Sequence, residues 1–431
     1  MLHANITKSL VLILIASAFG FHAVAQSNLQ PYQKAAIATR FASEVKYNFA
    51  GYGKFGQNFD SICRAELPTI VNTATDEEFN QQLQLLANRL HDGHTSIGYT
   101  ADVTYAPISQ KRFGDRVFVT GVYSDEYTQK GVKSGTEIIA INGMPIIEYG
   151  NKYVVPFIPS STEQWSKTYA FNSENLTKGN RGEPITITFQ NKGGKPFDIV
   201  DQRQSPWGIV KPDMTFKYST LPGNIGLLRI PSFRSNNFDF SRLVEVFDTE
   251  ITHNNGLIID IRDNIGGNSQ IGEALMMLLA TDSIPTGSWD TPRYDAAYAS
   301  WGQEWHTITE PAQSYPPYFM QTNEVAKYDK PIVLLINNGT FSSSENFAAL
   351  FRNSKRGLII GTPTGGSTGN PIVINLGWGY YGRICTRQER LADGTEFIGV
   401  GIQPDIYIEE TEEVLFGKDD VLNQALKTFN L

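Results

Sequence analysis

The second half of this chain alternates short apolar runs with segments of helical character, and no other feature restricts the possible folds so strongly. Four runs have the length and composition of buried strands: 225–230, 257–261, 332–336 and 358–360. Helices are expected at about 269–280 and 343–353. Strands that alternate with helices form a mainly parallel sheet covered by helices, with functional groups at the carboxyl ends of the strands. We therefore predict an α/β core over residues 206–431.

The beginning of the chain has the pattern of an export signal. Lys8 precedes an apolar stretch at 10–18, and the small residues Ala23 and Ala25 stand before Gln26. The pattern predicts a signal peptide over residues 1–25 and a periplasmic or secreted protein. No later run reaches the roughly 18 apolar residues of a membrane span, so no integral membrane segment is expected after signal removal.

Charge and cysteine content narrow the possible partners. The formal net charge is −8, which argues against nucleic acid and anionic membranes as partners. Cys63 and Cys385 are the only cysteines, and either a disulfide or two separate thiols is compatible with an oxidising compartment. No metal-ligand spacing of histidines or cysteines is present, so neither a metal nor a cofactor is expected.

Residues 26–104 are predicted to be a helical region. Apolar side chains recur at helical spacing at Phe79, Leu83, Leu86 and Leu90. Thr75 can cap the start of this helix and Gly93 can close its end. His94 follows that closing glycine directly.

Residues 105–205 have the composition of short strands and turns. Strands are expected at 117–122 and 185–189, and a hairpin at Asn142-Gly143. The pattern Gly-x-x-x-Gly-x-x-Ile-x-x-Ile-Asn-Gly over 131–143 resembles a PDZ domain. PDZ domains bind extended chain ends by strand addition. A small β-rich insertion without a ligand is the alternative.

Ser342 is the candidate nucleophile. It follows the apolar run 332–336 through a short turn and precedes the predicted helix. A hydroxyl in this position lies beside free backbone N–H groups and the positive end of the helix dipole, which favour a developing oxyanion. The alternative is structural, because Ser342 and Glu345 also form the pattern of a capping box.

A serine nucleophile needs a base, and the histidines limit the choice. After signal removal the chain has His91, His94, His253 and His306, and none follows Ser342. The Gly-x-Ser-x-Gly pattern at 365–369 is therefore not a nucleophile elbow, since an elbow requires a later histidine. His94 is favoured because it lies just beyond the end of its helix.

A second glycine-rich loop follows the predicted strand 257–261. It contains Gly266 and Gly267 directly before a helix. Paired glycines let the backbone approach a ligand and point N–H groups into a site. An N–H of Gly266 or Gly267, opposite the N–H of Ser343, would complete an oxyanion hole.

These motifs occur in a recognisable order. They are Leu-x-Asp-Gly-His-Thr at 90–95, the PDZ-like segment, Asp-x-Arg-x-Asn-x-Gly-Gly at 260–267, Thr-Phe-Ser-Ser-Ser-Glu at 340–345, Gly-Thr-Pro-Thr-Gly-Gly at 361–366 and Gly-Ile-Gln-Pro-Asp at 401–405. The series resembles the carboxy-terminal processing peptidases and the tricorn core protease, over nearly all of the chain beyond the signal peptide. The resemblance implies a crotonase-like βαβ catalytic domain with an N-terminal helical region and a PDZ-like β-rich insertion. It also implies that Ser342 is the nucleophile.

One departure from that family pattern selects a branch. Processing peptidases have a general-base lysine directly after the glycine of the Thr-x-Gly loop, and here that position holds Ser367. The tricorn-like branch uses a histidine supported by a serine and a glutamate, so the resemblance implies His94 as base. The serine that would precede the histidine is replaced by Gly93. Glu396 is implied as the supporting glutamate, with Glu389 as the alternative.

The sequence thus predicts an exported serine endopeptidase that cleaves peptides or unstructured proteins through an acyl-enzyme. The alternative is an inactive binding module of the same fold for peptides or apolar ligands.

Overall fold

The computed structural model describes residues 29–56, 58–100, 103–203, 205–206, 216–234, 238–280, 283–293, 306–310, 314–315 and 328–429. The signal peptide predicted for residues 1–25 lies outside these residues. No helix in the described ranges is both long and apolar enough to cross a membrane.

The largest unit is a six-stranded sheet with the strand order β11-β12-β13-β18-β19-β23. β11 is antiparallel to β12, and every other neighbouring pair is parallel. The strands are β11 (Lys217–Leu221), β12 (Ile225–Arg229), β13 (Gly256–Asp260), β18 (Ile332–Ile336), β19 (Gly357–Gly361) and β23 (Ile406–Tyr407). Every residue of β13 and β18 is buried, as expected for central strands covered on both faces.

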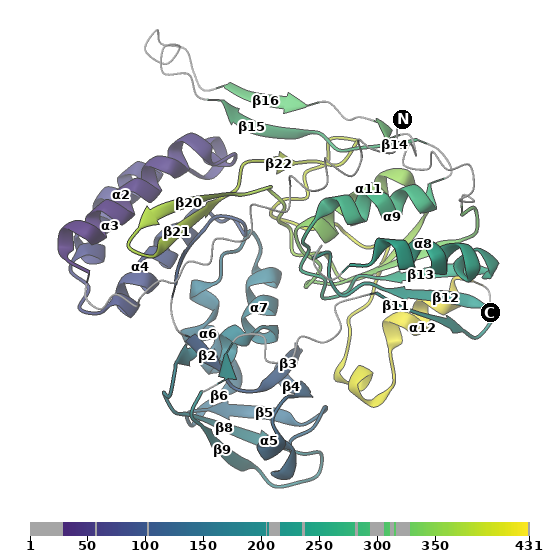
Figure 1. The fold of residues 1–431 in the computed structure, drawn as a ribbon, viewed down its shortest axis with the longest axis horizontal. Helices are drawn as coiled ribbons and strands as arrows, with labels where there is room; N and C mark the ends of the chain where they lie inside the picture. The colour runs from purple at the N-terminus through teal and green to yellow at the C-terminus, as the bar shows by residue number, and fades with distance from the viewer. Residues whose placement is uncertain are drawn as a thin grey trace, which may run out of the picture.

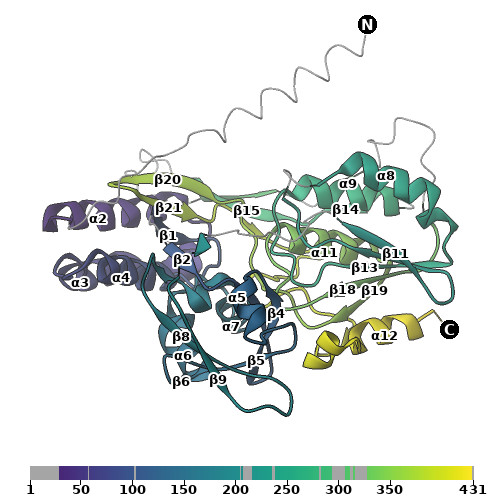
Figure 2. The same cartoon turned by 60° about the horizontal axis from the view of Figure 1, so that its bottom comes forward.

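Helices cover both faces of this sheet. α8 (Phe240–Thr249), α9 (Ser269–Leu279) and α11 (Ser343–Ser354) share one apolar core with Ile259 and Leu334, whereas α12 (Asp420–Lys427) packs with Ile258 and Val333 on the opposite face. The layers are visible in Figure 2. The predicted strands and helices of this α/β region are confirmed to within two residues.

Three helices form a separate group at the start of the described chain: α2 (Pro31–Asn48), α3 (Phe59–Val71) and α4 (Asp76–Asn88). They pack on a three-stranded antiparallel sheet of order β1-β21-β20. β1 (Ser96–Tyr99) follows α4, but β20 (Ile372–Gly377) and β21 (Tyr380–Ile384) come from the second half of the chain. This hairpin reaches over to the N-terminal helices (Figure 1), and so fixes them to the α/β core.

A third unit is built around an antiparallel sheet of order β3-β4-β5-β8-β9, with β6 paired to β5. Its strands are β3 (Ile108–Phe113), β4 (Arg116–Val122), β5 (Glu137–Ile141), β6 (Met144–Pro145), β8 (Ile185–Gln190) and β9 (Phe197–Asp201), and its helices are α5 (Asp125–Gln129), α6 (Ile146–Tyr153) and α7 (Glu163–Asn172). The predicted hairpin joins β5 to β6, where Asn142 and Gly143 both have positive φ, the geometry of a type I′ turn. The unit has its own apolar core.

Shorter pairings complete the description. One small sheet has the order β10-β2-β7, with β2 (Val103–Tyr105), β7 (Gly179–Asn180) and β10 (Ser205–Pro206). A second has the order β16-β15-β22, with β15 (Trp289–Arg293), β16 (His306–Glu310) and β22 (Gln388–Glu389). In addition, β14 (Ile284–Pro285) pairs with β17 (Ser314–Tyr315). Short helical turns lie at η1 (Tyr52–Gly56), η2 (Val155–Phe157), η3 (Glu174–Thr177), η5 (Ile251–His253) and η6 (Glu412–Phe416). Cys63 and Cys385 are both free thiols.

Candidate active site

Ser342 lies between β18 and α11 in a strained backbone conformation. Its φ is 60° and its ψ is −128°, a region that non-glycine residues rarely occupy and that costs on the order of 1–3 kcal/mol. The preceding turn is fixed from both ends, because the Thr340 hydroxyl donates to the Ile261 carbonyl at 3.0 Å and accepts from the Asn337 N–H at 3.1 Å. The Ser342 hydroxyl is thereby held at the start of the helix.

His94 connects Ser342 to a second serine. Its Nε2 lies 2.9 Å from the Ser342 Oγ, and its Nδ1 lies 2.9 Å from the Ser367 Oγ. The backbone before β1 is fixed by Asp92, whose Oδ1 accepts from the His94 N–H at 2.9 Å. A proton can therefore pass from the Ser342 hydroxyl to an imidazole whose other nitrogen is held by Ser367.

A stack of aromatic rings supports one face of the imidazole. His94 is stacked on Phe341 with a centroid distance of 4.8 Å, and Phe341 is stacked on Trp165 at 3.7 Å. The three rings come from the segment before β1, the β18–α11 turn and helix α7. The site is thus assembled from all three units of the fold.

The environment of His94 keeps its imidazole neutral. The residue is 2% exposed, and burial, assisted by the positive charge of Arg383, lowers the pKa of His94 to about 3. At neutral pH the ring therefore carries no charge and can accept a proton from a neighbouring hydroxyl.

Glu345 holds the Ser367 loop against the start of α11. Its fully buried carboxylate accepts hydrogen bonds from the Thr364 hydroxyl at 2.6 Å and from the N–H groups of Gly366, Ser367 and Ser342 at 2.7, 2.9 and 3.2 Å. Burial raises the pKa of Glu345 to about 7 in spite of these four donors. Glu345 therefore does more than cap a helix, since it positions the loop from which Ser367 reaches His94.

The glycine loop after β13 lies directly against Ser342. A side chain at Gly266 would come within 2.7–2.8 Å of the Phe341 carbonyl, the Ser342 Cβ and the Ser343 nitrogen, so only glycine permits this approach. The Gly266 N–H donates to the Asn264 Oδ1 at 2.9 Å. Gly266 is one of the two glycines that the sequence predicts as a possible oxyanion donor, and its N–H is already paired with this side chain.

Two other N–H groups face no acceptor. Within the described chain, the backbone N–H groups of Gly267 and Ser343 make no hydrogen bond. Gly267 has a φ of 147° and is exposed, and Ser343 is the first residue of α11. Both N–H groups can therefore donate to a bound ligand.

The two glutamates expected to support the histidine lie elsewhere. Glu396 is half exposed and pairs with Lys54 at 2.9 Å, and Arg390 lies 3.7 Å from its other oxygen. Glu389 accepts from the Asn346 amide. Neither carboxylate contacts His94. The expectation for Glu396 rested on its place before the Gly-Ile-Gln-Pro-Asp segment, and that place brings it to a surface ion pair.

His91 and His253 lie outside the site. His91 lies beside Phe55, with ring centroids 6.5 Å apart, and His253 is exposed next to Thr252. His306 is in β16, and its side chain is outside the described part. In the described residues, no group of three or more histidine, cysteine, aspartate or glutamate side chains is arranged to hold a metal ion.

A cavity of about 660 Å³ opens in front of His94 and Ser342. Its wall includes His94, Ser342 and Gly267, together with residues of α4, β1, α6 and β7. The site therefore has room for several residues of a peptide, a typical volume for a ligand cleft.

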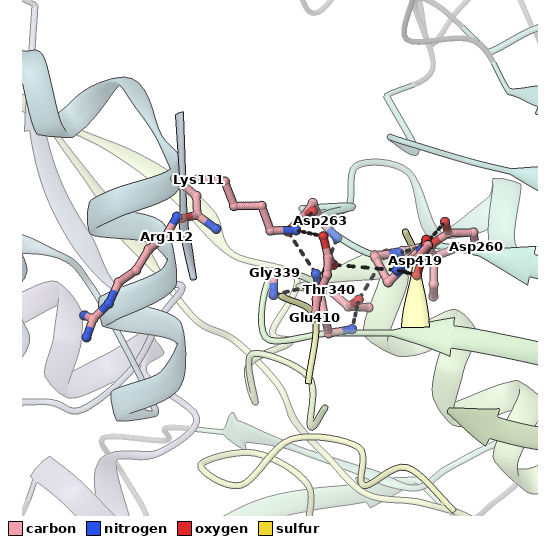
Figure 3. A network of polar contacts seen from close by, with 12 residues as sticks. Lys111, Arg112, Asp260, Asp263, Gly339, Thr340, Glu410 and Asp419 are labelled. Atoms are coloured by element: carbon pink, nitrogen blue, oxygen red, sulfur yellow. Dashed lines mark hydrogen bonds and ion pairs between the residues drawn. The ribbon is translucent and has the colours of Figure 1, made fainter. Parts of the chain in front are cut away.

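A network of ion pairs fixes the beginning of the glycine loop, at Asp263 (Figure 3). The Lys111 Nζ, from β3, lies 2.6 Å from the Asp263 Oδ2 and 2.9 Å from the Glu410 Oε1, whereas Arg112 points away from these carboxylates. Asp263 also exchanges hydrogen bonds with Asn337, at 2.9 and 3.0 Å. The antiparallel unit is thus joined to both loops that form the site.

The same network continues through a buried arginine. Arg262 pairs with Asp260 at 2.8 Å and with Asp419 at 2.7 Å. Burial alone would raise the pKa values of Asp260 and Asp263, but the adjacent Arg262 and Lys111 outweigh it, and both pKa values fall below the ordinary value. These carboxylates stay ionised at neutral pH.

Comparison with known proteins confirms the resemblance expected from the motifs. Residues 224–408 match the model of peptidase family S41. The chain is 29% identical over 242 residues to a carboxy-terminal-processing protease of Bartonella bacilliformis, covering 54% of this chain and 49% of that protein. It is 25% identical over 187 residues to a chloroplastic C-terminal processing peptidase of Tetradesmus obliquus, covering 43% and 35%. The chain spans about half or less of the length of these curated relatives.

Solved structures agree in fold over most of the chain. Mature CPAF superposes with a TM-score of 0.68 at 15% identity, covering 89% of this chain and 94% of that one. A putative peptidase from Parabacteroides merdae gives 0.54 at 16% identity, covering 93% and 97%. At these identities the likeness shows the fold alone.

Proposed function

We propose that this chain, whose residues 224–408 match peptidase family S41, is a serine endopeptidase that uses Ser342 as nucleophile and His94 as general base. The observation that carries the proposal is the single imidazole that lies 2.9 Å from the Ser342 Oγ and 2.9 Å from the Ser367 Oγ. A neutral, buried histidine beside a strained serine at a helix start is the arrangement that acyl transfer requires.

The proposed reaction begins with attack of the Ser342 Oγ on a peptide carbonyl carbon while His94 Nε2 takes the hydroxyl proton. Ser367 accepts the Nδ1–H of His94, which keeps Nε2 unprotonated before the attack. The N–H groups of Gly267 and Ser343 donate to the oxyanion. The imidazolium then gives its proton to the leaving amine, and water hydrolyses the acyl-enzyme with His94 again acting as base.

Glu345 and Ser367 replace the predicted Glu396 in this scheme. Ser367 holds His94 directly, and Glu345 holds the Ser367 backbone. A neutral hydroxyl stabilises an imidazolium less than a carboxylate does, so Ser367 acts mainly by fixing the ring orientation and tautomer.

The substrates proposed are peptides or unfolded proteins, and the protein is proposed to act after export, in the periplasm or outside the cell. Export is supported by the signal pattern at residues 1–25. The antiparallel unit at 105–205 is proposed to act as a PDZ-like domain that recruits a chain end. Its ion pair to the glycine loop, between Lys111 and Asp263, supports a direct connection between recruitment and the site.

Activity of the wild type should be compared with Ser342→Ala and His94→Ala on an unstructured protein substrate. We expect both variants to lose cleavage, and His253→Ala to retain it because His253 is exposed and remote from the site. Labelling with a fluorophosphonate should modify Ser342 in the wild type. Cleavage by the Ser342→Ala variant, or an inert serine in the folded wild type, would contradict the proposal.

Ser367→Ala tests the role of the second serine. We expect kcat to fall on the order of tenfold to a hundredfold with KM nearly unchanged, because the variant loses orientation of the base and no substrate contact. An unchanged kcat would remove Ser367 from the mechanism.

A further inference from the structure

β1 is an edge strand that runs beside the catalytic pair. It begins two residues after His94, and β21 is its only strand partner in the described part of the chain. All four residues of β1, 96–99, line the cavity that also contains Ser342. Consecutive side chains of a strand point to opposite faces, so a cavity that reaches every residue runs along the edge of the strand and not over one face.

The register shows which backbone groups face the cavity. Thr100 donates its N–H to the Gly379 carbonyl at 3.1 Å, and the β1–β21 register continues from this pair without a shift. In an antiparallel ladder, hydrogen-bonded pairs alternate with pairs that make no mutual bonds. Gly98 and Ser96 therefore bond to β21, whereas Ile97 and Tyr99 direct their N–H and C=O groups away from it. No hydrogen bond to the backbone of Ile97 or Tyr99 from outside the ladder occurs in the described residues.

We infer that the substrate binds as an additional β-strand on the free edge of β1, by backbone hydrogen bonds to Ile97 and Tyr99. This inference rests on the proposed peptidase function and specifies how the same site takes its substrate. Strand addition to an exposed edge is a recurrent way to bind an extended chain. Four residues of strand span roughly 13 Å, so about four residues of substrate are held.

This mode defines the substrate class. The bonds go to the substrate backbone, so the chain must be extended, and its side chains are restricted only weakly. A folded domain or a helix cannot present its backbone in this way, because its N–H and C=O groups are already paired. Proline is excluded from positions whose N–H must bond to β1.

A scan of backbone methylation tests the inference. A series of peptides of one sequence is made, each with a single N–H replaced by N–CH3 at a position flanking the cleaved bond, and kcat/KM is measured with the full-length protein. We expect losses on the order of tenfold at every second position, corresponding to one or two lost hydrogen bonds, and small effects between them. Equal effects at adjacent positions, or none, would overturn strand pairing.

A pair of protein variants gives an independent test. Tyr99→Pro removes an N–H that faces the cavity and leaves the ladder to β21 intact, and Tyr99→Ala removes the same side chain but keeps the N–H. We expect kcat/KM for peptides to be on the order of tenfold lower in Tyr99→Pro than in Tyr99→Ala, with equal fluorophosphonate labelling of Ser342. Equal kcat/KM values in two folded variants would overturn the inference, and if Tyr99→Pro does not fold, the methylation scan decides.

The two proposals fail in different ways. Absence of labelling and of cleavage in the wild type contradicts the peptidase function itself. Labelling and cleavage without alternation along the substrate contradict only the role of β1.

Discussion

Glu345, in the first turn of α11, and Asp263, on the glycine loop, are carboxylates beside the candidate site, and the protein holds them in opposite ways. Glu345 is fully buried among four neutral donors and faces no cation. Asp263 is half-buried against Lys111. The pKa of Glu345 is therefore raised to about 7, and the pKa of Asp263 is lowered. At Glu345 the four dipolar donors do not outweigh the cost of burying a charge, whereas at Asp263 the adjacent positive charge of Lys111 does.

The largest effect is expected from Glu345→Ala. The substitution leaves Thr364, Gly366 and Ser367 without an acceptor at a buried position, at a cost of about 3 kcal/mol in the free energy of unfolding. It also frees the loop that carries Ser367, so cleavage activity should fall at least a hundredfold. Urea unfolding and peptide cleavage measure the two effects. Glu345→Gln keeps the size and one carbonyl oxygen and should lose less, so equal losses in both variants would show that the acceptor count is unimportant.

Removal of the cation that pairs with the glycine loop should have a smaller effect. Lys111→Met leaves Asp263 and Glu410 without their partner at a site where the Lys111 side chain is 15% exposed. We expect a loss of about 2–3 kcal/mol in the free energy of unfolding. Lys54→Met is the matched control, because its pair with Glu396 is more than half exposed on both sides and should contribute less than about 1 kcal/mol. Similar losses in the two variants would show that the Lys111 pair contributes no more to stability than an exposed ion pair.

The two carboxylates should also respond to different pH ranges. Glu345 has a folded pKa above its unfolded value of 4.5, so the folded state binds the proton more tightly and stability falls as pH rises from about 4.5 to 7. Asp263 has a folded pKa below its unfolded value of 3.8. Its contribution to the free energy of unfolding is therefore present above pH 3.8 and is lost only in stronger acid.

Unfolding of the wild type and of Glu345→Gln across this range separates the two responses. The wild type should lose on the order of 2–3 kcal/mol relative to the variant between pH 4.5 and 7. His94 and Asp92 titrate in both proteins, so their contributions cancel in the difference. A constant difference across the range would mean that Glu345 is ionised throughout.

The smallest effect is expected at Glu396. Glu396→Gln should leave kcat/KM unchanged and alter the free energy of unfolding by less than about 1 kcal/mol, because its ion pair with Lys54 is exposed to solvent. A tenfold loss of activity in this variant would return Glu396 to the catalytic set.

Much of this fold follows from local patterns. The apolar runs at 257–259 and 332–336 form central strands because a strand buried on both faces needs mainly apolar residues. The Asn142-Gly143 turn follows from the positive φ that a tight hairpin requires. Thr75 and Glu78 cap α4 as their spacing predicts. In each case residues close in sequence determine the result.

The contacts of the candidate site are determined by tertiary structure. His94 and Ser367 are 273 positions apart, and no local pattern places their side chains together. Glu345 has the spacing of a capping residue, which conceals its bonds to the Ser367 loop. The Gly266 N–H was a reasonable donor from sequence, but the Asn264 side chain two residues earlier takes it. One useful signal was present in the sequence. Ser367 stands at the position of the general-base lysine of the processing peptidases, and a residue at that position is a candidate for contact with the histidine that serves as base instead.

The stack of His94, Phe341 and Trp165 has a consequence for the life of the chain before it is folded. Its three rings are contributed by segments that leave the ribosome far apart in time, and the last part of the site, Ser367, comes later still. A partly synthesised or unfolded chain therefore has no catalytic centre. The proposed protease would be harmless to its producer, and to itself, until the whole chain has folded.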